Sequence, residues 1–302
     1  GRFYALFALL MAFAMGAMAQ SGALADTFSA AFTLPRWRVG LVTAALALTI
    51  LLGGIRRIAE ISTVLVPVMA LLYLGGGLAV ILGNLRRLPE ALILMLRCAV
   101  APEAALGGAL GIVTRREALR WGVARSVFSN EAGLGSAAIT AACADTEEPV
   151  KQGLISMTGV FFDTMVICTV TGLAICCSGT LGAADGAGRP LTGAALTLRA
   201  FETVLGPLAP WLIGAALGLF AFTSVLGCAV QAETTASYLL GPEAVRPCRV
   251  LYGLAVFAGA VIPMATVLQL ADLANALMAF PNLVCLLLLS GEIAGECGRK
   301  ER

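Results

Sequence analysis

The stretch that decides the fold is FSNEAGLGS, residues 128–136. It places an amide, a carboxylate, two hydroxyls and two glycines inside a mainly apolar run over residues 118–142. Glycine weakens a helix by up to ~1 kcal/mol and frees backbone groups. Freed N–H groups suit an anion and freed carbonyls suit Na+, so the pattern fits a broken helix that binds a zwitterion. It fits equally well a hairpin tip at a membrane surface, with Ser136 as a helix cap.

The composition around this stretch is that of a membrane protein. Of 302 residues, 59% are hydrophobic and 13% are charged, and the mean hydropathy is +0.93. An average soluble domain has about a quarter charged residues. The net charge of +2 argues against a nucleic-acid partner, which requires a basic surface. The lipid bilayer is therefore the expected surroundings of this chain.

Apolar runs of about 20 residues predict spanning helices. We expect one transmembrane domain over residues 1–302, with about eight spans. The predicted spans are residues 3–28, 39–52, 64–82, 118–142, 153–178, 208–240, 250–268 and 271–289. Residues 104–113 are too short to span and suit a re-entrant segment, and residues 191–205 suit a surface helix. Pro281 is expected to interrupt the last span.

The residue types argue against an enzyme and against a resident cofactor. The chain has no histidine, which excludes Ser-His-Asp triads and most zinc sites. None of its nine cysteines forms a CxxC pair, and most lie in apolar runs. We interpret them as small buried hydrophobic residues.

Polar residues within apolar runs are the remaining candidates for function. Glu131 and Asp163 are carboxylates in or beside predicted spans, where ionisable groups usually serve function. The alternative for Glu131 is a structural pair with Arg125 or Arg120.

Three uncharged polar residues are weaker candidates. The adjacent hydroxyls of Thr223 and Ser224 could bind a hard cation, but such groups more often bond to their own helix. Gln20, at the end of an apolar run, could bind a substrate or join two helices.

At this point the sequence resembles the alanine/glycine:cation symporter family, also called sodium:alanine symporters. The resemblance is densest over residues 120–171. It rests on FSNEAGLGSA at 128–137, TEEPVKQG at 146–153 and GVFFDT at 159–164. Weaker matches, such as residues 53–59 and 278–283, extend it over nearly the whole chain.

The resemblance implies an all-α integral membrane bundle of the leucine-transporter type, with two inverted five-helix repeats. It implies Na+-coupled uptake of alanine or glycine across a prokaryotic cytoplasmic membrane. Thr223 and Ser224 would help to bind sodium. The substrate-binding residues that it implies are Gln20, Phe128, Asn130, Gly133, Gly135 and Ser136, with Phe128 as an apolar gate.

Two departures from the family pattern bear on function. After Gly227 the family usually has a Trp-Ser-Tyr-Tyr-Gly-Glu pattern, whereas this chain has CAVQAE at 228–233, which predicts a larger pocket or a changed substrate. The family's amino-terminal helices, including its other broken helix, are missing, so the chain looks like about two-thirds of a transporter. A non-transporting remnant or a partner-dependent subunit is therefore the alternative function.

Overall fold

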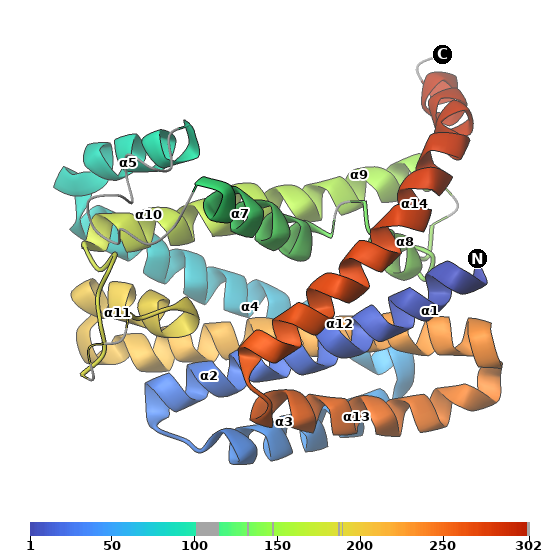
Figure 1. Cartoon of the computed structure of the whole chain (residues 1–302), viewed down its shortest axis with the longest axis horizontal. Helices are drawn as coiled ribbons and strands as arrows, with labels where there is room; N and C mark the ends of the chain where they lie inside the picture. Colours follow the sequence, from blue (N-terminus) through green and yellow to red (C-terminus); the bar gives the residue numbers. More distant parts are fainter. Residues whose placement is uncertain (101–114, 132, 147, 187, 189, 301–302) are drawn as a thin grey trace.

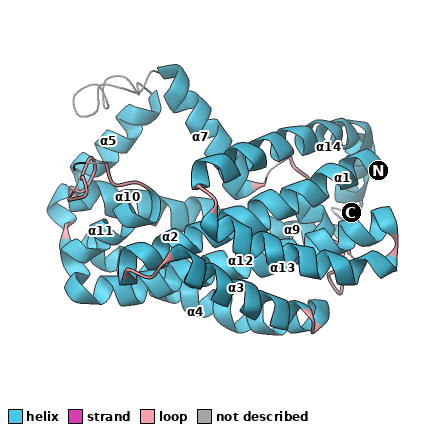
Figure 2. Ribbon diagram, turned by 60° about the horizontal axis from the view of Figure 1, so that its bottom comes forward, coloured by secondary structure: helices cyan, strands magenta, loops and turns pink. Residues whose placement is uncertain are grey.

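The computed structural model describes residues 1–100, 115–131, 133–146, 148–186, 188 and 190–300, and its regular elements there are all helical (Figures 1 and 2). The prediction of an all-α chain is confirmed. The elements are α1 Arg2–Met11, η1 Ala12–Ala19, α2 Gln20–Phe32, α3 Arg36–Leu51, α4 Gly54–Gly83, η2 Leu85–Arg87, α5 Leu88–Val100, α7 Arg115–Asn130, α8 Ser136–Ala141, α9 Pro149–Val160, η3 Phe161–Ile167, α10 Cys168–Ser178, α11 Gly193–Leu205, η4 Gly206–Leu208, α12 Ala209–Leu240, η5 Pro242–Ala244, α13 Val245–Val261 and α14 Met264–Lys300.

Six helical segments among the described residues are long and apolar enough to cross a membrane, which makes this a multi-pass membrane protein. They are Arg2–Phe32, Gly54–Gly83, Pro149–Ser178, Gly193–Leu240, Pro242–Val261 and Met264–Gly295. The predicted span at 39–52 lies in α3, which has only 16 residues. The predicted span at 118–142 is divided between α7 and α8. The expected re-entrant segment at 104–113 lies outside the described residues.

The boundary between the last two predicted spans was wrong. The chain turns at Ile262 and Pro263, so α13 ends at Val261 and α14 begins at Met264. Ile262 has extended backbone (φ −67°, ψ 144°) because proline disfavours helical geometry in the residue before it. The interruption expected at Pro281 was also wrong, since α14 stays helical through it. Membrane helices accept an internal proline where neighbouring groups satisfy the freed carbonyl.

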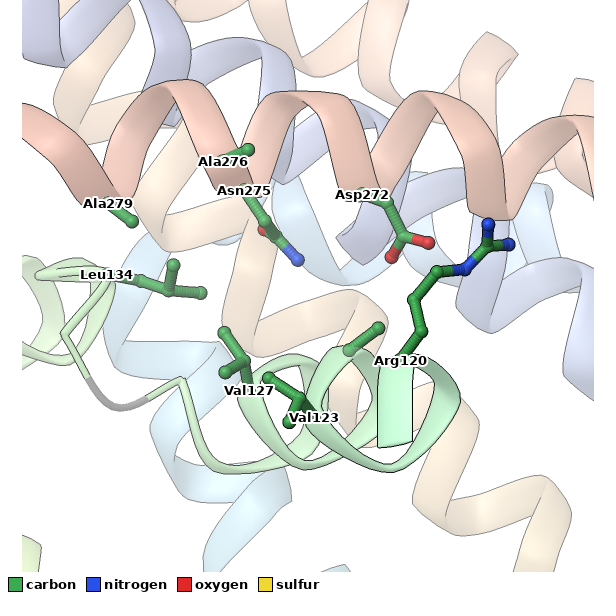
Figure 3. Close-up of a pocket in the computed structure, with 9 residues that line it drawn as sticks. Arg120, Val123, Val127, Leu134, Asp272, Asn275, Ala276 and Ala279 are labelled. Carbon is green, nitrogen blue, oxygen red and sulfur yellow. The ribbon is translucent and has the colours of Figure 1, made fainter. Parts of the chain in front are cut away.

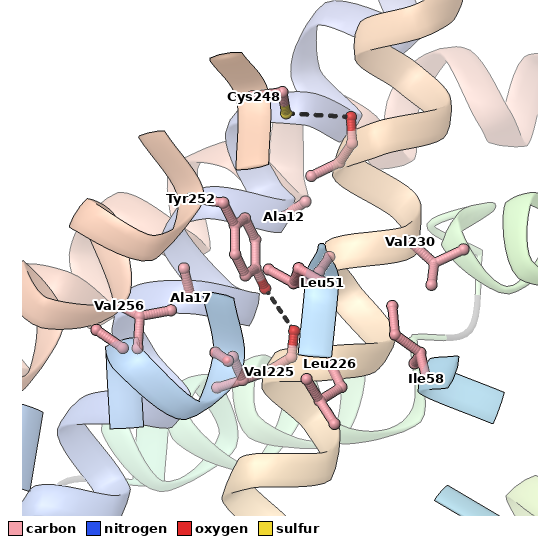
Figure 4. Packing of buried hydrophobic residues seen from close by; sticks show 14 of the residues in the cluster. Ala12, Ala17, Leu51, Ile58, Val225, Leu226, Val230, Cys248, Tyr252 and Val256 are labelled. Atoms are coloured by element: carbon pink, nitrogen blue, oxygen red, sulfur yellow. Dashed lines mark hydrogen bonds between the residues drawn. The ribbon is translucent and has the colours of Figure 1, made fainter. Parts of the chain in front are cut away.

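The long helix α12 forms the centre of the bundle and packs against α1, α2, α4 and α13 (Figure 1). A cluster of buried apolar side chains joins it to η1, α3 and α13, with Leu51, Leu226 and Tyr252 among its members (Figure 4). The Tyr252 hydroxyl donates a hydrogen bond of 2.8 Å to the Val225 carbonyl. This bond satisfies the one polar atom that burying the Tyr252 side chain brings into the cluster.

Backbones touch where α13 crosses the first helical segment. A Cβ on Gly259 would lie 2.3 Å from the Met18 Cα and from the Met18 carbonyl oxygen. Helices in membranes commonly pack through small residues in this way. The contact fixes the end of η1, directly before Gln20.

The outer surface of the bundle is apolar. Large exposed side chains include Leu71, Phe280, Leu287 and Leu288, the last of which is 80% exposed. In water such a surface would favour aggregation, but lipid tails solvate it. The apolar runs of the sequence therefore serve two surfaces, the packed interior and the lipid-facing exterior.

Candidate functional site

The chain leaves helical geometry between α7 and α8, where the sequence predicts a break. Glu131, Gly133 and Gly135 all have left-handed backbone, with φ of 55°, 77° and 80°. This geometry is uncommon for a residue with a side chain, such as Glu131, and easy for glycine. We call the connection from Glu131 to Gly135 the broken segment.

Side chains from two distant helices bind the broken segment. The Tyr4 hydroxyl of α1 donates to the Leu134 carbonyl at 3.0 Å, and the Asn282 amide of α14 donates to the Gly133 carbonyl at 2.9 Å. Two of the carbonyls freed by the break thus already have protein donors. Asn282 belongs to a string that matches the family, whereas Tyr4 carried no signal in the sequence.

The Gly135 backbone lies directly against the side chains of Tyr4 and Asn282. A Cβ there would lie 2.4 Å from the Asn282 Oδ1 and 2.7 Å from the Tyr4 hydroxyl. Together with its positive φ, this close approach means that only glycine fits the position without displacing a neighbour.

Ser136 and Glu131 bond to each other across the broken segment. The Ser136 hydroxyl, which is fully buried, donates to the Glu131 carboxylate. The predicted alternative of Ser136 as a helix cap was wrong, because its side chain makes no capping bond and Gly135 precedes α8. The pairing of Glu131 with Arg125 was also wrong, since Arg125 binds Asp272 instead.

With only six residues, α8 is too short to serve as the anion-binding half-helix that the sequence suggested.

The end of α7 is tied to η3, a π-helical segment between α9 and α10. Ser129 donates to the Asp163 Oδ2 at 3.1 Å, and the Asn130 amide donates to the Thr164 hydroxyl at 2.9 Å. Short π-helical segments recur at functional sites. The predicted site residue Asn130 is thus held by η3. Phe128, two residues earlier, lies under the Arg125 guanidinium, whose Cζ is 5.0 Å from the centre of the ring.

A first cavity, of about 330 Å³, brings together two of the predicted site residues, Gln20 and Ser224. The Tyr73 hydroxyl and the Thr171 hydroxyl, which are 2.8 Å apart, also line it. None of the described residues that line it is charged. We call it the amide–hydroxyl cavity; its polar lining residues are Gln20, Thr27, Tyr73, Thr171, Thr197 and Ser224.

The two hydroxyls predicted to bind sodium have different surroundings. Ser224 faces the amide–hydroxyl cavity, whereas Thr223 bonds to its own helix at Leu219 O (2.9 Å) and Phe220 O (3.0 Å). Consecutive helical residues point in directions about 100° apart, so both hydroxyls face one ion only after Thr223 turns away from its helix.

A second cavity, of about 380 Å³, lies between α7 and α14 (Figure 3). Arg120 and Asp272 line it together with the amide of Asn275, and Leu134 of the broken segment reaches it from the other end. Arg125 of α7 binds both carboxylate oxygens of Asp272. We call this the charged cavity.

The Trp-to-Cys departure does not open either cavity. Cys228 is buried, and a Cβ on Gly16 would lie 2.1 Å from the Cys228 Cβ. Two helices therefore meet closely at this position, and an indole ring would not fit there. The larger pocket predicted from the departure is not found at Cys228, which lines neither cavity.

The chain is similar to a family of transport proteins along nearly its whole length. The sequence profile described as "Sodium:alanine symporter family" matches residues 1–298. The sodium/alanine symporter AgcS of Methanococcus maripaludis is 38% identical over 97% of this chain and 63% of its own length. An uncharacterized transporter of Haemophilus influenzae is 40% identical over 95% of this chain and 62% of its own length. The probable sodium/glutamine symporter GlnT of Bacillus subtilis is 38% identical over 95% of this chain and 59% of its own length. The chain thus spans about 60% of the length of these relatives.

Proposed function

Because this chain belongs to the sodium:alanine symporter family, we propose that it acts as a symporter that takes up small neutral amino acids, alanine or glycine, together with Na+. The family consists of transporters and not of enzymes. The proposal includes the leucine-transporter type of architecture, with inverted repeats. It also assigns the substrate to the amide–hydroxyl cavity.

The observation that carries the substrate class is the lining of the amide–hydroxyl cavity. Amide and hydroxyl groups line it, and its described residues include no charged side chain. Burying a charge without a partner is costly, so an amino acid with a charged side chain would bind poorly there. The substrates named for two relatives, alanine and glutamine, are both neutral amino acids. The volume of about 330 Å³ lies in the usual range of small-molecule sites, about 300–1,000 Å³.

The same lining supplies a physical reason for coupling. A zwitterion carries a carboxylate for which this cavity offers hydroxyls and an amide rather than a cation. A Na+ ion bound at Ser224, with Thr223 turned toward it, would stand beside that carboxylate and favour its binding. Sodium would thus raise amino-acid affinity, and rocking of the helices would expose the site to either side.

The proposal also gives the broken segment a part in transport, separate from the lining of the amide–hydroxyl cavity, to which none of its described residues belongs. Asn130, Gly133, Gly135 and Ser136 lie at or beside the break, and Phe128 precedes it as an apolar gate. Gln20 would bind the substrate from the first span. Tyr4 and Asn282 donate hydrogen bonds to carbonyls of the broken segment. In this proposal, these bonds change when the substrate binds.

A second candidate concerns the bundle of these residues taken by itself. In it, the bundle transports only together with further helices from a partner chain, or it is a remnant that does not transport. In this candidate the fold and the cavities are the same, but the bundle alone does not transport amino acids.

Uptake into liposomes tests the proposal. The purified protein is reconstituted, and entry of labelled L-alanine is measured with an inward Na+ gradient and with K+ in its place. We expect accumulation with Na+ alone. Absence of uptake by correctly folded protein would contradict transport by this chain, and uptake restored by a co-expressed amino-terminal segment of a relative would support the partner-dependent candidate.

A further inference from the structure

The charged cavity contains a buried polar atom without a partner. Asn275 is 6% exposed, and its Oδ1 has no hydrogen-bond partner among the described residues. Its amide nitrogen reaches only the Met15 thioether, at 3.9 Å. Burying an unsatisfied amide oxygen destabilises a protein, so its presence calls for an explanation. A ligand that donates a hydrogen bond from within the cavity is one.

The charges at this cavity suit an anion as well. Arg125 already neutralises Asp272, and Arg120 adds a second guanidinium to the lining. The cavity and its ion pair therefore carry two guanidinium groups and one carboxylate. A guanidinium group binds a carboxylate through parallel hydrogen bonds, so Arg120 suits a ligand carboxylate.

The rest of the lining is apolar and small. Leu134 and Ala279 lie at the end of the cavity away from Arg120, and Val127 lies across from Asn275 (Figure 3). This wall suits a short aliphatic side chain. A donor for Asn275, a carboxylate for Arg120 and a small apolar group for the wall together describe one chemical class, the small neutral amino acids.

We propose that the charged cavity is a second amino-acid site. Arg120 binds the carboxylate of the ligand, Asn275 Oδ1 and Asp272 accept hydrogen bonds from its ammonium group, and Val127 and Leu134 contact its side chain. The inference rests on the proposed function in its choice of ligand, and it adds a site separate from the amide–hydroxyl cavity. Because Leu134 belongs to the broken segment, a ligand here would also contact the element that we assign to transport.

Equilibrium binding of labelled L-alanine to the full chain in detergent, in the presence of Na+, tests this site. We expect two molecules bound per chain. Asn275→Leu, which has a similar shape and no amide, should remove one of them, with an affinity loss of at least about tenfold. Arg120→Gln, at an exposed side chain that contacts the neighbouring Trp121 ring, should weaken the same site.

Thermal unfolding adds a readout that does not depend on binding strength. If Asn275 serves a ligand and not stability, Asn275→Leu should unfold at the same or a higher temperature without alanine and should lose part of the stabilisation by alanine. Asn275→Leu protein that unfolds at a clearly lower temperature, or wild-type protein that binds one alanine with unchanged affinity in both variants, would overturn the second site. Failure of the proposed function looks different, since wild-type protein would then show no Na+-dependent binding.

Discussion

The amide–hydroxyl cavity and the charged cavity differ in whether the protein itself supplies charged groups to bind a zwitterion. The first offers amide and hydroxyl groups, with Gln20 and Ser224 on its lining. The second offers a guanidinium group, a carboxylate and a buried unpartnered amide oxygen. A site without its own charges needs an ion to bind a carboxylate tightly, whereas a site with them does not. The difference in lining thus predicts a difference in sodium dependence.

The largest expected effect comes from the broken segment, whose Leu134 lines the charged cavity. Gly135→Leu forces a side chain against Asn282 and Tyr4 at a left-handed position and so displaces the segment. We expect alanine uptake to fall at least about 100-fold, because small displacements of a site have effects of this size. Uptake into liposomes and membrane insertion are the measurements.

The matched control is Gly122→Leu, because Gly122 lies in α7 with open space around it. This variant should transport alanine normally. Normal uptake by Gly135→Leu itself would contradict the place of the broken segment in the site.

Loss of the amide in the first cavity should have the next largest effect. Gln20→Leu removes a hydrogen bond to a charged group of the substrate, worth about 1.5–3 kcal/mol, so we expect alanine uptake to fall about 10- to 100-fold. Thr49→Val is the control, since Thr49 is exposed and bonds to its own helix. Equal uptake by the two variants would remove Gln20 from the substrate site.

Removal of sodium should weaken alanine binding in the amide–hydroxyl cavity and not in the charged cavity. With choline in place of Na+, we expect alanine to bind the amide–hydroxyl cavity at least about fivefold more weakly, since a nearby charge contributes about 1 kcal/mol or more. The alanine bound in the charged cavity should remain. Asn275→Leu protein, with only the first site, should then bind alanine more tightly in Na+ than in choline. Loss of both molecules without Na+ would contradict the comparison.

The smallest expected effect concerns one hydroxyl of the first cavity. Tyr73 donates to Thr171, whose own proton goes to the Ile167 carbonyl at 2.7 Å. The Tyr73 oxygen can still accept a hydrogen bond from the ammonium group of the substrate. Tyr73→Phe removes that bond, worth about 1 kcal/mol, so the KM for alanine should rise about fivefold. Tyr238→Phe, at an exposed position, should leave KM unchanged. A rise of the same size in both variants would remove Tyr73 from the site.

Local patterns in the sequence predict the features of this fold that depend on neighbouring residues. Apolar runs predict the spans, and the glycines of residues 128–136 predict the break before Ser136. A helix is present where a surface helix was expected at 191–205, but α11 buries Leu198 and Phe201 in the core of the bundle. Each of these depends on residues within a few turns of one another, so one sequence is sufficient.

Contacts between distant helices could not be predicted in this way. Arg125 and Asp272 are 147 positions apart, and Tyr4 and Leu134 are 130 apart. Which helices become neighbours decides these pairs, and hydropathy does not report it. Similarly, Pro263 ends a helix whereas Pro281 is tolerated inside one. Residue type alone does not distinguish the two prolines.

The central claim is that the amide–hydroxyl cavity selects neutral amino acids because its described lining is uncharged. The most direct test is competition against Na+-driven alanine uptake, in wild-type protein and in Gln20→Glu, which adds a carboxylate of nearly the same shape. We predict that glycine competes in wild type and that lysine and aspartate do not, whereas lysine becomes a competitor in Gln20→Glu. Competition by charged amino acids in wild type, or an unchanged profile in Gln20→Glu, would contradict the account.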